Sequence, residues 1–112
     1  MPPVLKALKK ADAIALVSPV YFFDMTAQLK LAVDRMFALL SVKTPIKKAA
    51  FLLTCGDNTE TAADGAIVTY KSICRHSNWE DAGVIVVTGL HNPGEIEGRA
   101  ELDKAMALGA EL

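Results

Sequence analysis

Residues 11–22 read Ala11-Asp12-Ala13-Ile14-Ala15-Leu16-Val17-Ser18-Pro19-Val20-Tyr21-Phe22. The apolar run at 13–17 is followed at once by Ser18 and Pro19, which are residues typical of turns. An uninterrupted apolar run of this length is typical of a strand that is buried on both faces, as in a parallel sheet. The stretch therefore predicts a buried strand that leads into a loop.

Two further apolar runs, at 49–53 and 84–87, have the same character. The runs recur at roughly 35 residues, which is about the length of a βαβ unit. Between them the apolar residues follow the helical i, i+3, i+4, i+7 pattern. The first stripe is Leu29, Ala32, Val33, Met36, Phe37 and Leu40, and the second is Ala63, Ala66, Ile67, Tyr70, Ile73 and Cys74.

The helix ends carry their own signals. Thr26 or Asp24 is expected to cap the first of these helices, and Asp57, Asn58 or Thr59 the second. Pro2 and Pro3 are expected to begin an N-terminal helix. A C-terminal helix is expected to place Leu102, Ala105, Met106 and Gly109 on one face. The resulting order α-β-α-β-α-β-α predicts an α/β fold with about three parallel strands and helices on both faces.

The composition is that of one globular domain. Of the 112 residues, 52% are hydrophobic and 22% charged, and the formal net charge is −1. The sequence has no basic patch of the kind that would predict nucleic-acid binding. No apolar run approaches the roughly 20 residues of a membrane helix. Without a signal-peptide pattern, we expect a cytoplasmic protein. Cys55 and Cys74 fit a reducing compartment and are not spaced as a metal motif.

Ligands of open α/β sheets bind at the carboxyl ends of the strands. Three segments are expected there, at 18–26, 54–59 and 88–94, and all are rich in Gly, Pro, Ser, Thr and Asn. No catalytic acid–base pair and no metal site is apparent in them. Cys55 is either a redox thiol or, as we favour, a small buried hydrophobe. His91 is either a substrate contact or, as we favour, a solvated loop residue.

The run 11–22, together with Met25-Thr26-Ala27-Gln28-Leu29-Lys30 and Asp34-Arg35, resembles the NADPH-dependent FMN reductase family of flavodoxin-like proteins. The resemblance implies a flavodoxin-like three-layer sandwich. It also implies an NAD(P)H oxidoreductase that passes two electrons through FMN to a small acceptor such as a quinone or free flavin. The cofactor carries the hydride chemistry in such enzymes, which fits the lack of a catalytic dyad.

By the same resemblance, the loop after the first strand lies along the isoalloxazine ring, with Tyr21 or Phe22 as its flat apolar wall. The implied cofactor-binding residues are Ser18, Pro19, Val20, Tyr21, Phe22, Thr54, Cys55, Gly56 and Asp57. Gly89 and His91 are implied to border the nicotinamide or substrate pocket.

Full-length family members begin with a strand and a turn that hold the FMN phosphate at a helix N-terminus. We expect residues 1–112 to be a single partial domain that corresponds to family strands 3-4-5 and lacks that segment. Weak or absent FMN binding is then expected, and Met1 is expected to be an internal methionine. A homodimer is the expected assembly. The alternative function is a flavin-free dimeric structural or binding module; a receiver-like domain and an acidic flavodoxin carrier fit less well.

Overall fold

A computed structural model describes residues 2–36, 44–59 and 61–112. The elements follow one another in the predicted order along the chain. They are α1 (Pro2–Leu8), β1 (Ala13–Pro19), α2 (Ala27–Arg35), β2 (Lys48–Thr54), α3 (Asp64–Ser77), β3 (Glu80–Val87) and α4 (Ala100–Glu111). The predicted α/β alternation is therefore confirmed.

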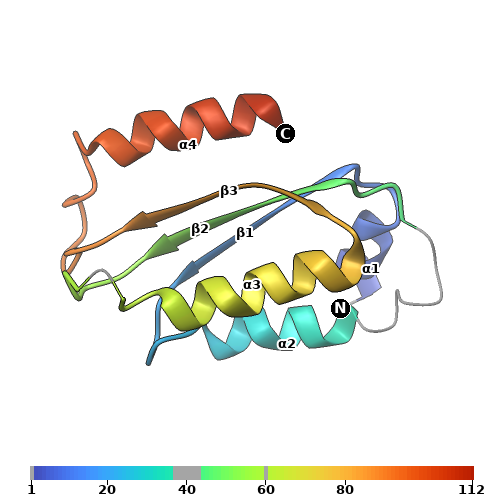
Figure 1. Cartoon of the computed structure of the whole chain (residues 1–112), viewed down its shortest axis with the longest axis horizontal. Helices are drawn as coiled ribbons and strands as arrows, with labels where there is room; N and C mark the ends of the chain where they lie inside the picture. The colour runs from blue at the N-terminus through green and yellow to red at the C-terminus, as the bar shows by residue number, and fades with distance from the viewer. Residues whose placement is uncertain (1, 37–43, 60) are drawn as a thin grey trace.

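The strands form one sheet in the order β1-β2-β3, and both strand pairs are parallel. Helices α2 and α3 cover one face of the sheet, α4 lies on the other, and α1 stands near the amino ends of the strands (Figure 1). The carboxyl ends of all three strands consequently meet at one edge of the molecule, which is the edge where ligands of such sheets bind.

The core lies between the sheet and the α2–α3 layer. Phe51 of β2 and Tyr70 of α3 are fully buried, and their rings stack with centroids 4.9 Å apart. Leu16 and Leu53 belong to the same buried cluster. The Tyr70 hydroxyl donates a hydrogen bond of 2.8 Å to the Asp81 carboxylate, so the ring is fixed at both ends.

The two predicted helix caps differ in outcome. Thr26 caps α2 as predicted, because its hydroxyl accepts a hydrogen bond from the Leu29 amide at 3.2 Å. Helix α3 instead begins after Ala63 without a side-chain cap, so the prediction of Asp57, Asn58 or Thr59 was wrong. Asp57 accepts from the Thr59 amide at 2.7 Å and thereby shapes the loop instead. Phe37 and Leu40, predicted for the first helix, lie outside the described residues.

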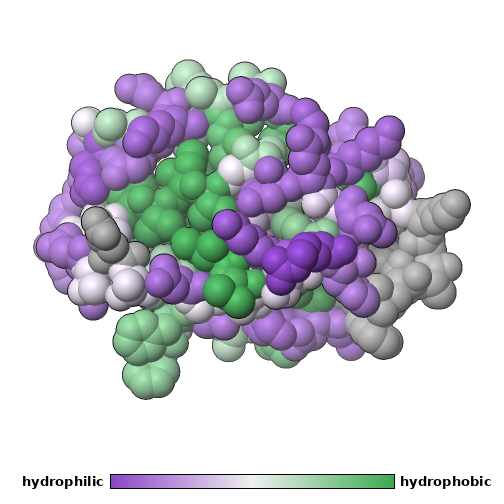
Figure 2. All heavy atoms as spheres, in the orientation of Figure 1, coloured by the Kyte–Doolittle hydropathy of each residue, from purple (hydrophilic) through white to green (hydrophobic). Residues whose placement is uncertain are grey.

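Two predicted faces also needed correction. The first strand is not buried on both faces, because Leu16 is 4% exposed but Val17 is 67% exposed. Helix α4 packs over β3, at the opposite edge of the sheet, and leaves that face of β1 uncovered. On α4 it is Leu108 that is buried, against Gly83 of β3, whereas Met106 is 78% exposed. Apolar side chains also reach the surface between α3 and α4 (Figure 2).

The third strand is longer than its apolar run. It starts at Glu80, and its pairing with β2 shifts by one residue where Asp81 and Gly83 face Ala49 and Ala50. The Asp81 carboxylate accepts the Gly83 amide across this bulge at 3.0 Å. No helix among the described residues has the length and hydropathy to cross a membrane.

Candidate functional site

Backbone hydrogen bonds join the loops that follow the three strands. The Val20 amide donates to the Thr54 carbonyl at 2.7 Å, and the Cys55 amide donates to the Val87 carbonyl at 2.9 Å. The Leu90 amide donates back to the Cys55 carbonyl at 3.0 Å. These bonds continue the sheet beyond its last regular pairs and hold the loops in fixed relative positions.

The loop after β1 contains a tight turn formed by two aromatic residues. Tyr21 and Asp24 exchange both backbone hydrogen bonds, at 2.9 and 3.3 Å, with Phe22 and Phe23 between them. Phe22 has φ of 48° and Phe23 has φ of 73°. Two consecutive positive values define a type I′ turn, in which Asn-Gly is the favoured pair. A bulky side chain in this region of φ is strained, and such strain concentrates at functional sites.

The strained turn is fastened from several sides. The Asp24 carboxylate accepts from the Met25 amide at 2.7 Å and from the Thr69 hydroxyl of α3 at 3.2 Å. Gly65 of α3 lies so close that a Cβ there would stand 2.5 Å from the Phe23 carbonyl oxygen. The turn is therefore tied to the helix that packs on the core, although its two rings are not.

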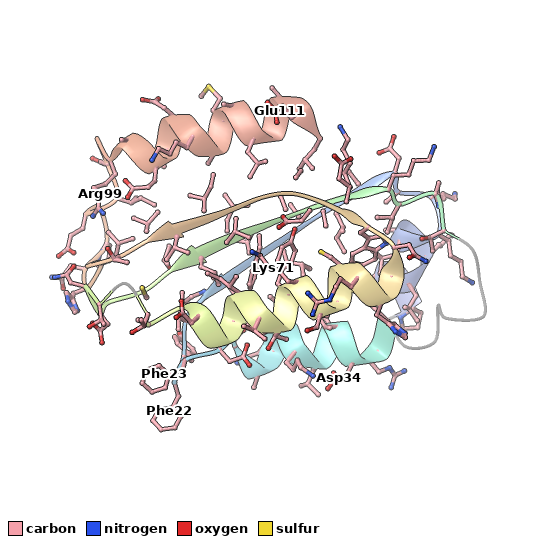
Figure 3. All side chains as sticks on the ribbon, viewed as in Figure 1. Phe22, Phe23, Asp34, Lys71, Arg99 and Glu111 are labelled. Carbon is pink, nitrogen blue, oxygen red and sulfur yellow. The ribbon has the colours of Figure 1, made fainter. Side chains whose placement is uncertain are left out.

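The two phenylalanine rings project from the carboxyl edge of the sheet (Figure 3). Phe22 is 95% exposed and Phe23 59% exposed, and their ring centroids are 5.5 Å apart. Their side chains therefore gain little from the folding of the chain itself. A rigid backbone that presents exposed aromatic rings is suited to contact a flat apolar ligand.

A cleft of about 230 Å³ opens beside the turn. Its lining residues come from the loops after β1 and β2: Val20, Phe22, Phe23, Cys55, Gly56, Asp57 and Ala62. The walls are mostly apolar and carry one carboxylate. Among the described residues, the amides of Phe22 and Gly56 donate no hydrogen bond within the chain. Flat apolar walls with a few polar groups suit the ring system of a flavin.

The charge state of the cleft is set by Cys55 and Asp57. Burial, reinforced by the Asp57 charge, raises the pKa of the Cys55 thiol, which therefore stays neutral at neutral pH. Hydrogen bonds from Thr59 hold the pKa of the exposed Asp57 carboxyl below its ordinary value. The lining thus presents one negative charge and no positive charge.

The loop after β3 stands beside this cleft. The His91 ring packs over Gly56, where a Cβ would lie 3.0 Å from the His91 Cε1 atom. Glu95 fixes His91 by accepting its amide at 2.9 Å, and this bond holds the pKa of Glu95 below its ordinary value. Gly89 has φ of 71° and lies against Asn58, so a side chain there would be strained and would collide.

Five of the predicted cofactor residues line the cleft: Val20, Phe22, Cys55, Gly56 and Asp57. Ser18 lies beneath the loop at 3% exposure, where its hydroxyl donates to the Pro19 carbonyl and accepts the Thr26 amide. Pro19, Tyr21 and Thr54 also lie outside the lining.

Phe23 and Ala62 were not among the predicted site residues, although both line the cleft. Nothing in the spacing of the sequence distinguishes Phe23 from the rest of the loop. The signal that could have identified Phe23 is the adjacent pair of aromatic residues in a loop, because aromatic rings that stay exposed there contribute little to the stability of the fold.

A sequence profile of the NADPH-dependent FMN reductase family matches residues 1–70. The matched part includes the loops after β1 and β2, whereas Gly89 and His91 lie beyond it. No protein of curated function matches the chain by sequence.

The chain is similar in structure to the Trp repressor binding protein from Bacillus subtilis, with a TM-score of 0.73 and 23% sequence identity. The similarity covers 97% of this chain and 71% of that one, and it confirms the flavodoxin-like fold. Because the family profile spans more than half of the 112 residues, this chain belongs to the NADPH-dependent FMN reductase family.

Proposed function

We propose that this chain is the flavin-binding part of an NAD(P)H-dependent oxidoreductase that reduces a small acceptor, such as a quinone or free flavin. The observation that carries the proposal is the apolar cleft beside the strained Phe22–Phe23 turn, in the part of the chain that the family profile matches. FMN, when bound, supplies the hydride and electron chemistry. The chain's own residues then have to bind, orient and shield its ring.

Each lining residue suits one of these tasks. Phe22 and Phe23 offer flat apolar surface to the ring, and the Phe22 and Gly56 amides, which donate to no described residue, offer donors to its polar edge. The Asp57 carboxylate is an acceptor for a ring N–H group. The neutral Cys55 thiol packs as a small hydrophobe. The Thr54 carbonyl accepts the Val20 amide and the buried Ser18 hydroxyl accepts the Thr26 amide, so both hold the loop after β1 in place.

NAD(P)H and the acceptor are assigned to the side of the cleft bordered by Gly89 and His91. The His91 ring packs over Gly56 and so adjoins the cleft without filling it. We further propose a homodimer as the working unit. Both cysteines are free and buried, as expected of the reducing cytoplasm in which we place the protein.

The test is a flavin fluorescence titration of the purified chain, with Phe22→Ala compared with Val68→Ala. Val68 is 63% exposed on α3 and is not part of the cleft lining, so the control removes an exposed apolar side chain without touching the cleft wall. Stacking is worth roughly 0.5–1.5 kcal/mol, so we expect Phe22→Ala to weaken flavin binding by about two- to twelvefold. Val68→Ala should leave flavin binding unchanged.

Turnover is measured by oxidation of NADPH in the presence of added FMN and a benzoquinone. We expect the Phe22→Ala loss of binding to appear as a higher FMN concentration at half-maximal rate. Equal titration curves for Phe22→Ala and the unaltered chain would refute the placement of the flavin. No change of flavin fluorescence at any concentration would refute flavin binding by this chain, and with it the proposed function of residues 1–112, in favour of the flavin-free module.

A further inference from the structure

The Phe22–Phe23 turn has no local source for its conformation. Phe22 and Phe23 have φ of 48° and 73°, values that bulky residues avoid, and neither ring is buried. The two backbone hydrogen bonds between Tyr21 and Asp24 close the turn, but such bonds form at least as well around glycine or asparagine. A contact from outside the turn is therefore needed to hold two phenylalanines in this conformation.

The contact from outside reaches the turn through the side chain of Asp24. One oxygen of the Asp24 carboxylate accepts the amide of Met25 at 2.7 Å, and Met25 itself is buried in the core. The other oxygen accepts the hydroxyl of Thr69 at 3.2 Å, from a residue 45 positions further along the chain. Among the described residues, Thr69 is the only one outside this loop that makes a hydrogen bond to a side chain of residues 21–24.

Thr69 lies on a helix that is fixed to the core. Ala66 and Tyr70, which flank Thr69 on α3, are both 0% exposed. The Thr69 hydroxyl also lies 3.0 Å from the Gly65 carbonyl oxygen, so its single hydrogen can serve either this oxygen or the Asp24 carboxylate. A carboxylate is a stronger acceptor than a peptide carbonyl. Helix α3 therefore offers the turn a hydrogen-bond donor in a fixed position.

We propose that Thr69 is a positioning residue of the flavin site: its hydrogen bond to Asp24 holds the Phe22–Phe23 turn in the left-handed conformation and keeps both rings beside the cleft. Thr69 does not line the cleft, so it acts on a ligand only through the turn. Without the hydroxyl we expect the turn to relax to negative φ, which releases strain while it removes a hydrogen bond. Flavin binding should then weaken although the fold persists. The inference rests on the proposed function for the identity of the ligand, whereas the effect on the turn needs no flavin.

The first test measures the turn itself in the flavin-free chain. Amide hydrogen exchange followed by NMR reports the two backbone bonds between Tyr21 and Asp24. We expect both amides to lose protection in Thr69→Val and to keep it in Thr69→Ser, which retains the hydroxyl. Ser72→Ala is the matched control, because it removes an exposed hydroxyl of the same helix that bonds Arg75 and not the turn. Serine, threonine and valine have similar helix propensities, so α3 is equally favoured in both Thr69 variants.

The second test separates positioning from a general effect on stability by a double-mutant cycle. Flavin fluorescence titrations compare the effect of Thr69→Val in the unaltered chain and in the double variant Phe22→Ala and Phe23→Ala. We expect Thr69→Val alone to weaken flavin binding by about threefold or more, and by no more than the loss of both rings does. In the variant without the rings it should change flavin binding by less than about twofold, because no ring is left to position. Thr69→Ser should bind flavin as the unaltered chain does.

Three outcomes would overturn the proposal. One is unchanged exchange of the Tyr21 and Asp24 amides in Thr69→Val. Another is equal weakening of flavin binding by Thr69→Val with and without the two rings, which would indicate a general effect on the fold. The third is a Thr69→Ser variant that behaves like Thr69→Val. If no variant binds flavin, the proposed function fails, and the exchange rates still decide whether Thr69 holds the turn.

Discussion

At the scale of single residues, the turn between Tyr21 and Asp24 places two phenylalanines where glycine or asparagine is favoured. Phe22 and Phe23 both have positive φ, and neither ring is buried. The fold therefore bears a conformational cost that no packing of these rings offsets. Contact with a flat ligand would offset it, which is why we assign the turn to the flavin.

We predict that the double substitution Phe22→Asn and Phe23→Gly stabilises the fold and weakens flavin binding at once. Asn-Gly suits a type I′ turn, so the free energy of unfolding should rise by about 1 kcal/mol. Urea unfolding and a flavin titration of the same preparation measure the two effects. A variant with lower stability, or with undiminished flavin binding, would contradict this account.

At the scale of secondary-structure elements, the approach of α3 to the turn depends on one glycine. A Cβ at Gly65 would stand 2.5 Å from the Phe23 carbonyl oxygen, whereas a Cβ at Gly109 of α4 would meet nothing within 4 Å. A substitution at Gly65 therefore tests a steric requirement, whereas the same substitution at Gly109 tests helix propensity alone.

We predict opposite effects for Gly65→Ala and Gly109→Ala. The first should destabilise the fold by about 1–3 kcal/mol, because the turn or the helix must move, and it should also weaken flavin binding. The second should stabilise it by up to about 1 kcal/mol, as alanine is the better helix former. Thermal unfolding of both variants measures this, and a stabilising Gly65→Ala would show that α3 does not position the turn.

The contact between α3 and β3 also carries a pH dependence. Burial, and then the hydrogen bonds with Cys74 and Asp81, raise the pKa of the Tyr70 hydroxyl far above its value in an unfolded chain. The folded protein therefore keeps this proton at pH values where the unfolded chain loses it. Stability from this group is fully present below about pH 10 and is lost as the pH rises further.

We predict that Tyr70→Phe reduces this alkaline loss of stability. At pH 7 the variant should lose about 1 kcal/mol with the hydrogen bond to Asp81, while the stacking on Phe51 persists. Between pH 9 and 11 its urea midpoint should fall less steeply than that of the unaltered chain. Buried Cys74 and Cys55, whose pKa values are also raised, account for the remaining slope. Parallel slopes would count against a Tyr70 contribution.

At the scale of the whole molecule, the charge balance bears on how FMN would be held. The net charge is −1, and the residues that line the cleft include Asp57 but no lysine or arginine. A phosphate contact with a charged partner would be worth roughly 1.5–3 kcal/mol. No described residue that lines the cleft can make such a contact with the FMN phosphate. The flavin ring itself therefore has to supply the affinity.

We predict that riboflavin and FMN bind this chain with affinities within about threefold of each other. A charged phosphate contact would favour FMN by about tenfold or more, and the cleft provides none. Raising the salt concentration should leave FMN binding unchanged or strengthen it slightly, since salt screens the repulsion from Asp57. Fluorescence titrations with both flavins at two ionic strengths measure this. Much tighter binding of FMN, weakened by salt, would contradict it.

The sequence by itself determined the order of elements, the parallel sheet and the edge at which the loops meet. Continuous apolar runs and helical stripes are local patterns, and the parallel topology follows from their alternation. The signal of the family was also local, since it joins a strand, a loop and a helix at 11–35. For the same reason most of the cleft, including Val20, Phe22 and Gly56, could be predicted.

Only the tertiary structure decided the exposure of Val17 and Met106, the burial of Leu108, and the role of Phe23 in the cleft. An apolar residue contributes to the same local sequence pattern whether or not another helix or strand covers it in the fold. Burial depends on where α4 crosses the sheet, and the conformation of the turn depends on its clamp by Thr69 and Gly65. These are contacts between residues far apart in the chain, and no local pattern records them.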